Sequence, residues 1–208
     1  PSTGDQVGDG PAGVEPLGRL RITVTGGPGP LGPSGRGSLP TLVVAAGPAP
    51  TRAPTAEVVT VEWRVNEHSP LAGAKTTSYL EHVLVLAEAH RRGADEAVSA
   101  NTAGALAEGT GSNVFLVVDG ELCTPSLTTG CLRGVTRDLV LDQVPVLERD
   151  DLTLHDLRRA PEAFLTSSLR DVHPIARVDG QTLAAAPGGL TQHAAQALAA
   201  LQAATLDP

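Results

Sequence analysis

Short runs of alternating hydrophobic and polar residues predict β-strands in the first third of the chain. In residues 19–25, RLRITVT, every second side chain is apolar, which is the two-residue period of a strand. Residues 41–46, TLVVAA, and residues 56–63, AEVVTVEW, give two further strand-like runs. Residues 1–18 are rich in glycine and proline, so we expect a flexible tail or a linker there and ordered structure from residue 19 onward.

The hydrophobic period lengthens to that of a helix after residue 78. Ser78 and Glu81 have the spacing of a capping box, and Arg91, Arg92 and Gly93 supply a basic last turn followed by a stop. The sequence therefore predicts an amphipathic helix with Ser78 as its N-cap. The apolar stripe of this helix consists of Leu80, Val83, Leu84 and Ala87.

The remainder of the chain mixes strands and helices. Asp119 and Gly120 stand between two strand-like runs, VFLVV and ELCTP, and predict a tight hairpin. Further strands are expected at EAVSAN, ALAEG and AFLTSS. Helices are expected at VTRDLVLDQV, TLHDLRRA and LTQHAAQALAALQAAT. This mixture predicts a soluble protein of mixed α/β type.

Composition and charge narrow the classes of partner. At 208 residues, 41% of them hydrophobic, the chain can bury a substantial core. A net charge of -8 argues against nucleic acid or an anionic membrane, so small molecules or proteins are the expected partners. No apolar run reaches the roughly 18 residues of a membrane span, and Cys123 and Cys131 make no disulfide framework, which fits a reducing cytoplasm. The six histidines lack metal-ligand spacing, so no metal site is expected.

Lysine is used at one position. Lysine and arginine total 15, and the sequence contains a single lysine, Lys75, which leaves 14 arginines. Only an amine that can lose its proton acts as a nucleophile or forms a Schiff base, and arginine does not do this. Lys75 lies in the connection before the predicted helix, so it is either a reactive amine in a cleft or a solvated lysine on a loop.

Two further positions offer contacts to a charged ligand. Glu108 ends an apolar strand before the glycine-rich loop GTGSN, where it is either capped by loop amides or faces a ligand cation. Val135 and Thr136 open a helix after a glycine, an arrangement typical of an anion site, with ordinary N-capping by Thr136 as the alternative. Residues 26–37, GGPGPLGPSGRG, lack the Gly-Lys-Ser/Thr ending of a phosphate loop and indicate a surface loop instead.

A lone amine, a buried acid and a phosphate-type helix terminus follow one another in the order that a pyridoxal phosphate enzyme needs. Residues 71–174 resemble the C-terminal domain of the class IV, fold-type IV aminotransferases, a family that includes branched-chain aminotransferases, D-amino acid aminotransferases and aminodeoxychorismate lyases. The resemblance rests on four blocks, AGAKTTSYLEHVL, EGTGSNVFLVVDGELCTP, GCLRGVTRDLV and FLTSSLRDVHPI. It implies an α+β fold like that of D-amino acid aminotransferase, with a mixed, barrel-like sheet flanked by helices over residues 19–208, and pyridoxal 5'-phosphate as cofactor.

The resemblance also implies roles for individual residues. Lys75 would hold the cofactor as a Schiff base and move the proton at the substrate α-carbon, while Glu108 would pair with the pyridine nitrogen. The backbone amides of Val135 and Thr136, together with Ser168, would hold the phosphate. The same blocks place four more residues near the cofactor: Leu132 on one ring face, Tyr79 beside the phenolic oxygen, and Ser112 and Asn113 in the loop beneath the ring.

The reaction follows less directly from the sequence. The segments AGAKTTSY and SSLRDV most resemble those of actinobacterial aminodeoxychorismate lyases, which release pyruvate and leave 4-aminobenzoate for folate synthesis. Arg170 is then a candidate for binding a substrate carboxylate, with a surface ion pair to Asp171 as the alternative.

Two other hypotheses are a transaminase of branched-chain or D-amino acids and a non-catalytic fragment. The fragment hypothesis arises because the family has an N-terminal domain of roughly a hundred residues, and no segment of this chain is expected to form it. The resemblance also implies a homodimer with each site near the subunit boundary.

Overall fold

The computed structural model describes residues 18–31 and 39–205 in two compact units, which divide after Thr51. The first unit contains an antiparallel hairpin of β1 (Gly18–Thr25) and β2 (Thr41–Pro48), which confirms the first two predicted strands. The predicted domain, residues 19–208, includes the hairpin and the whole of the second unit. The predicted tail falls almost wholly outside the described residues, and the glycine-rich segment 26–37 does so in part.

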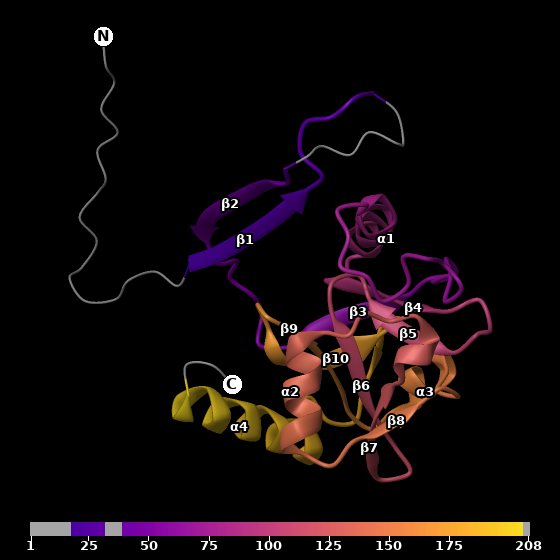
Figure 1. Cartoon of the computed structure of the whole chain (residues 1–208). Helices are drawn as coiled ribbons and strands as arrows, with labels where there is room; N and C mark the ends of the chain where they lie inside the picture. The colour runs from indigo at the N-terminus through magenta and orange to yellow at the C-terminus, as the bar shows by residue number, and fades with distance from the viewer. Residues whose placement is uncertain (1–17, 32–38, 206–208) are drawn as a thin grey trace. The chain divides into compact units, whose positions relative to one another are not determined.

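The second unit is built on a nine-stranded mixed sheet (Figure 1). Its strand order is β5-β4-β3-β10-β9-β6-β7-β8, with β11 paired to β10. The strands are β3 (Ala56–Thr60), β4 (Glu96–Ala100), β5 (Leu106–Gly109), β6 (Asn113–Val118), β7 (Glu121–Pro125), β8 (Leu147–Arg149), β9 (Ala163–Ser167), β10 (Asp171–Val178) and β11 (Gln181–Thr182). The helices are α1 (Leu80–Arg91), α2 (Val135–Gln143), α3 (Leu154–Arg159) and α4 (Gly189–Ala204), with a short 3-10 helix, η1 (Leu127–Thr129).

The sheet combines parallel and antiparallel pairs and curls into a half-barrel, which confirms the predicted α+β class. Strands β3–β10, β3–β4 and β7–β8 run parallel, and the other pairs in this sheet are antiparallel. The predicted hairpin forms between β6 and β7, where Asp119 and Gly120 adopt φ values of 53° and 84°. Two successive residues with positive φ give a turn whose twist matches that of the strands.

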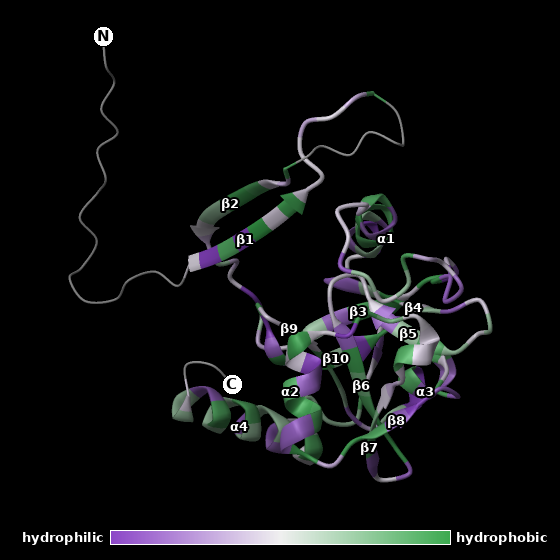
Figure 2. Ribbon diagram, viewed as in Figure 1, coloured by the Kyte–Doolittle hydropathy of each residue, from purple (hydrophilic) through white to green (hydrophobic). Residues whose placement is uncertain are grey.

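Hydrophobic side chains are buried on both faces of the sheet. Strand β6 is hydrophobic along most of its length (Figure 2) and contributes alternate residues to two clusters. One cluster joins β3, β6, β9 and β10 to α3, and the other packs β6 and β9 against α2 and α4. In the second cluster the rings of Phe115 and Phe164 stack at 4.7 Å. The second cluster fixes α2, and with it the helix entrance predicted to bind an anion.

Helix α1 differs from its sequence-based prediction in two respects. The helix ends as predicted, with Gly93 at φ 76°, but its N-cap is Tyr79 and the capping box is not formed. The N–H of Ser78 instead donates to Thr76 Oγ1, which keeps these residues in a turn. Leu80, Val83 and Leu84, on the predicted apolar stripe, are exposed, because the helix packs through Val85 and Ala89 against the cluster beside β4.

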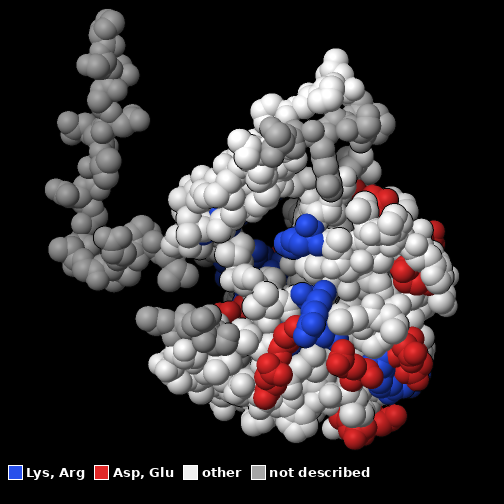
Figure 3. Space-filling view, viewed as in Figure 1, with Lys and Arg blue, Asp and Glu red and all other residues white. Residues whose placement is uncertain are grey.

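The surface of the second unit carries charges of both signs. On the face shown in Figure 3, basic side chains lie in separate spots with acidic side chains close to several of them. Within the described residues, no helix is both long and apolar enough to cross a membrane.

Candidate functional site

Glu108 lies in β5 with one carboxylate oxygen bonded to a backbone amide across the site. The N–H of Leu132 donates to Glu108 Oε2 at 2.8 Å. Burial raises the pKa of Glu108 to about 7, although the Leu132 N–H and the charge of Lys75 both act to lower it. The amide that caps this carboxyl belongs to Leu132 and not to the glycine-rich loop, while the alternative that Glu108 faces a ligand cation stays a prediction.

Lys75 lies in an exposed segment five residues before the first residue of α1. Its charge acts on Glu108 and also on His82, whose pKa is lowered mainly by burial and additionally by Lys75. Tyr79 lies between Lys75 and α1, and its ring stacks on the His82 ring at 4.7 Å. Lys75 is therefore close enough to Glu108 for its charge to act on that carboxyl, and the proposed contacts of Lys75 and Tyr79 with a cofactor stay predictions.

Leu132 is fixed through both of its backbone groups. While its N–H donates to Glu108, its carbonyl accepts a 2.7 Å hydrogen bond from Asn113 Nδ2. Asn113 Oδ1 lies so close to Gly134 that a Cβ there would be 2.1 Å from it. A side chain at position 134 would clash with the Asn113 amide, and glycine avoids this. Gly134 can therefore connect Leu132, the predicted ring-packing residue, to α2.

The N-terminus of α2 is open as an anion site. Gly134 is the N-cap, and no side chain caps the helix, so the alternative of N-capping by Thr136 is not formed. The first N–H groups of a helix have no acceptors within the helix. Thr136 is buried, whereas Val135 is 71% exposed. These backbone amides can therefore bind a phosphate in the way that helix termini generally do.

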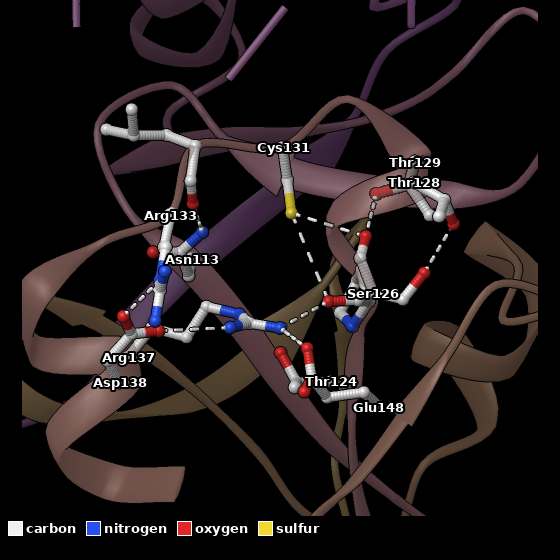
Figure 4. Close-up of polar contacts among 12 residues, drawn as sticks. Asn113, Thr124, Ser126, Thr128, Thr129, Cys131, Arg133, Arg137, Asp138 and Glu148 are labelled. Atoms are coloured by element: carbon white, nitrogen blue, oxygen red, sulfur yellow. Dashed lines mark hydrogen bonds and ion pairs between the residues drawn. The ribbon is translucent and has the colours of Figure 1, made fainter. Parts of the chain in front are cut away.

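Arg137 anchors this helix terminus and was not predicted from the sequence (Figure 4). Its side chain is 2% exposed, and its Nη2 donates to the Pro125 carbonyl at 3.0 Å and to Glu148 Oε2. Its Nη1 lies 3.3 Å from Asp138 Oδ1, and Asp138 also binds Arg133. An arginine placed directly after the Gly-x-Thr entrance was the one available signal in the sequence.

The two predicted serines differ in their surroundings. Ser112 is buried and donates to Glu96 Oε1 at 2.7 Å, whereas Ser168 is exposed at the turn after β9. Arg170, two residues further on, forms its ion pair with Glu96 rather than with Asp171. The Arg170 side chain is 8% exposed, so the surface ion pair considered as an alternative is replaced by a buried one. Glu96 was not singled out in the sequence.

A groove of about 450 Å³ is lined by residues that neighbour Lys75 and Leu132 along the chain. It runs between the segment before Lys75 and the loop that leads to Leu132, and is lined by Glu67, Ser69, Ala72, Gly73, Leu127, Thr128, Gly130, Cys131 and Arg133. A larger groove of about 810 Å³ elsewhere in this unit is lined by none of the predicted site residues. The smaller groove is also lined by none of the predicted residues themselves, but Gly73 lies two residues before Lys75, and Cys131 and Arg133 flank Leu132, so we place the site beside it.

These residues fit pyridoxal phosphate. The group requires an amine, an acid that can face a ring nitrogen, and an anion site for its phosphate. Lys75 can supply the amine, and Glu108 can supply a largely buried carboxyl, whose pKa burial raises. The uncapped start of α2 supplies the third part.

Replacing Glu108 with glutamine is expected to stabilise the cofactor-free protein at high pH. Because the folded pKa is about 7 against an ordinary value of 4.5, the contribution of Glu108 to stability is present below about pH 4.5 and is lost as pH rises through 7. Glu108→Gln should therefore unfold with a free energy roughly 2 kcal/mol higher than wild type at about pH 8 and equal to it at about pH 5. Urea titrations at the two pH values measure these free energies of unfolding. The same difference between variant and wild type at both pH values would contradict the raised pKa.

Comparison with known proteins gives a consistent picture. The family described as amino-transferase class IV matches residues 5–178. A protein named "Putative branched-chain-amino-acid aminotransferase" from Methanocaldococcus jannaschii is 35% identical over 177 residues, which cover 79% of this chain and 60% of that protein.

Two solved structures share the fold. The branched-chain aminotransferase from Thermoproteus uzoniensis, solved with norvaline, has a TM-score of 0.80 at 31% identity and covers 88% of this chain and 63% of its own. A structure titled "Putative 4-amino-4-deoxychorismate lyase" from Legionella pneumophila has a TM-score of 0.80 at 25% identity and covers 90% of this chain and 69% of its own.

The extent of these matches decides what they establish. The chain spans about 60% of the length of the M. jannaschii relative. The family match nevertheless includes well over half of this chain. It also includes all of the predicted site residues, since none of them lies beyond residue 178. The chain therefore belongs to the class IV aminotransferase family, whose members depend on pyridoxal phosphate.

Proposed function

We propose that this chain carries the cofactor-binding part of an enzyme that acts at the α-carbon of an amino substrate. When bound, pyridoxal phosphate supplies an electron sink for the electrons released at that carbon. The observation that supports the proposal best is that the sole lysine acts electrostatically on a largely buried carboxyl, Glu108, in a chain that also has an uncapped helix terminus at α2. The homodimer implied by the family resemblance belongs to the same proposal.

Lys75 has two roles in this proposal. Its amine attaches the cofactor and, once released, accepts the proton from the substrate α-carbon and returns it to a neighbouring atom. An exposed position between a turn and α1 leaves the amine free to move between these roles. Leu132, whose two backbone groups are both held, would pack against one face of the ring.

Glu108 and α2 orient the cofactor from opposite ends. Glu108 Oε2 is bonded to the Leu132 amide, so in our proposal Oε1 faces the ring nitrogen and keeps that nitrogen protonated. A positive partner lowers the pKa of the carboxyl and favours its ionised form. The amides of Val135 and Thr136, with Ser168, hold the phosphate.

The first candidate reaction is transamination of a branched-chain amino acid. It is favoured by the relatives, since the M. jannaschii protein and the T. uzoniensis structure are both named as branched-chain aminotransferases. In this reaction Lys75 would take the proton from the α-carbon; overall, the amino acid becomes its keto acid and an acceptor keto acid receives the amino group. A D-amino acid substrate would use the same residues.

The second candidate reaction is release of pyruvate from 4-amino-4-deoxychorismate, which leaves 4-aminobenzoate. It is favoured by the block SSLRDV and by the likeness to the L. pneumophila structure. The Arg170 guanidinium, proposed to bind a substrate carboxylate, is held by Glu96 in the structure, so this role requires the remaining N–H groups of Arg170.

One assay separates the two reactions. The protein, loaded with pyridoxal phosphate, is given aminodeoxychorismate without a keto acid, and in a parallel sample valine with 2-oxoglutarate. We expect glutamate to form in the second sample and no pyruvate in the first. Pyruvate release without an acceptor would instead establish the lyase. Turnover in neither sample, with cofactor bound at Lys75, would contradict both substrates and leave D-amino acids to be assayed next.

A further inference from the structure

Glu96 is a buried acid at the start of β4 whose side chain is 1% exposed. Its Oε1 accepts hydrogen bonds from the N–H of Gly111 at 2.8 Å and from Ser112 Oγ at 2.7 Å. Both donors belong to the loop that follows Glu108. Glu96 therefore holds the backbone that continues directly from the proposed ring-nitrogen partner.

Gly109 shows how closely the loop fits around this carboxylate. A Cβ at Gly109 would lie 2.5 Å from Glu96 Oε1 and 2.5 Å from Ser112 Oγ. A Cβ does not approach an oxygen this closely, so any larger residue after Glu108 would push the side chains of Glu96 and Ser112 apart. The glycine that the sequence suggested for a tight turn thus makes room for a buried charge.

Arg170 brings a second loop to the same carboxylate. Its Nη2 forms an ion pair with Glu96 Oε2, and its side chain is 8% exposed. Arg170 lies in the turn between β9 and β10, two residues after Ser168, and its N–H donates to the carbonyl of Ser167 at 2.9 Å. The position of this turn is therefore tied to Glu96 through a buried ion pair.

We propose that Glu96 is a positioning residue for the cofactor: it joins the loop after Glu108 to the turn that carries Ser168, and Arg170 completes the connection. The inference rests on the proposed function, because it assigns Glu108 and Ser168 to opposite ends of the cofactor. Arg170 is accordingly a second positioning residue, and its charge serves mainly to neutralise Glu96. Because Glu96 binds both loops, it would fix the distance between Glu108, at the ring nitrogen, and Ser168, at the phosphate.

The test replaces Glu96 with glutamine and measures cofactor binding by this chain. Glutamine keeps the size and can still accept from Gly111, but it leaves the Arg170 guanidinium without its countercharge. We expect the dissociation constant for pyridoxal phosphate to rise roughly tenfold. At saturating cofactor, the circular dichroism of the bound chromophore should weaken, because the ring is held in a less defined orientation.

Glu162 provides a matched control. It is also a buried glutamate that accepts from backbone N–H groups and a hydroxyl, those of Leu190 and Thr191 at the start of α4. It lies next to the opposite end of β9 from Ser168. Glu162→Gln should lower the melting temperature of the protein yet leave the dissociation constant and the dichroism at saturation unchanged.

A double variant tests whether Arg170 acts through Glu96. Arg170→Gln should weaken cofactor binding to a similar extent, and Glu96→Gln combined with Arg170→Gln should be no weaker than the worse single variant, since the two residues form one connection. Fully additive losses would contradict the pairing. Unchanged binding and dichroism in Glu96→Gln, or equal changes in Glu162→Gln, would overturn the inference. If wild-type protein forms no adduct at Lys75, the proposed function fails instead.

Discussion

Replacing Lys75 with alanine should abolish covalent attachment of pyridoxal phosphate and lower turnover by at least about 10³-fold. The protein has no second lysine that could substitute. Lys75 is proposed both to attach the cofactor and to move the α-proton, so its loss removes two contributions at once. The measurements are the visible absorption of the bound cofactor and the initial rate of the assay described above.

Lys75→Arg is the control for charge. Arginine keeps a positive charge near Glu108 but cannot lose a proton to act as a nucleophile. We expect it to bind the cofactor without a covalent bond and to be as inactive as Lys75→Ala. Substantial turnover by either variant would show that Lys75 is a solvated loop residue and that the chemistry takes place elsewhere.

Replacing Arg137 with alanine should produce the largest loss of stability among the charged residues of the site. Arg137 is 2% exposed and connects the first turn of α2 to the Pro125 carbonyl and to Glu148. Arg137→Ala removes a buried side chain and leaves the Pro125 carbonyl without its hydrogen bond, whereas Glu148, whose side chain is 46% exposed, can be solvated, so the expected cost is about 2 kcal/mol. Guanidinium chloride unfolding of the cofactor-free protein measures this loss, and phosphate inhibition of cofactor binding should weaken in parallel.

Arg158 offers a comparison in the same fold. It pairs with Asp179 but is 38% exposed, so Arg158→Ala should cost about 1 kcal/mol or less. A loss for Arg137→Ala as small as that for Arg158→Ala would mean that the buried network in Figure 4 does not stabilise the start of α2.

The elements that could be predicted from the sequence are those defined by local patterns. The hairpin at Asp119 and Gly120 needs only residues that tolerate positive φ, and α1 ends at Gly93 for the same reason. The strands followed from alternation, and α3 begins with the capping box of Thr153 and Asp156. Each of these features depends on a few neighbouring residues, which is why the sequence sufficed.

Features that depend on distant parts of the chain were not predictable. The predicted start of α1 was wrong because the N–H of Ser78 donates to Thr76 Oγ1. The face of the helix that packs is set by the small side chain of Ala89 beside β4. Spacing identifies an apolar stripe but does not say which side of a helix meets the sheet. The stripe predicted for α1 remains exposed in the chain.

The site divides in the same way. Lys75 stood out because it is unique, and Glu108 because it ends a strand before a glycine-rich loop. Glu96 and Arg137 lie within ordinary strand and helix patterns, and their roles arise from loops 15 and 12 residues away along the chain. Which loop a buried charge meets is decided by the topology of the sheet.

The most direct test of the central claim is to locate the reduced cofactor on the wild-type chain. After incubation with pyridoxal phosphate and reduction with borohydride, trypsin should leave residues 65–91 as one modified peptide, because a substituted Lys75 is no longer cleaved and Arg64 and Arg91 bound the segment. The account predicts this peptide with the cofactor mass on Lys75. Cleavage at Lys75 with no modified peptide, at cofactor concentrations that saturate related enzymes, would contradict it.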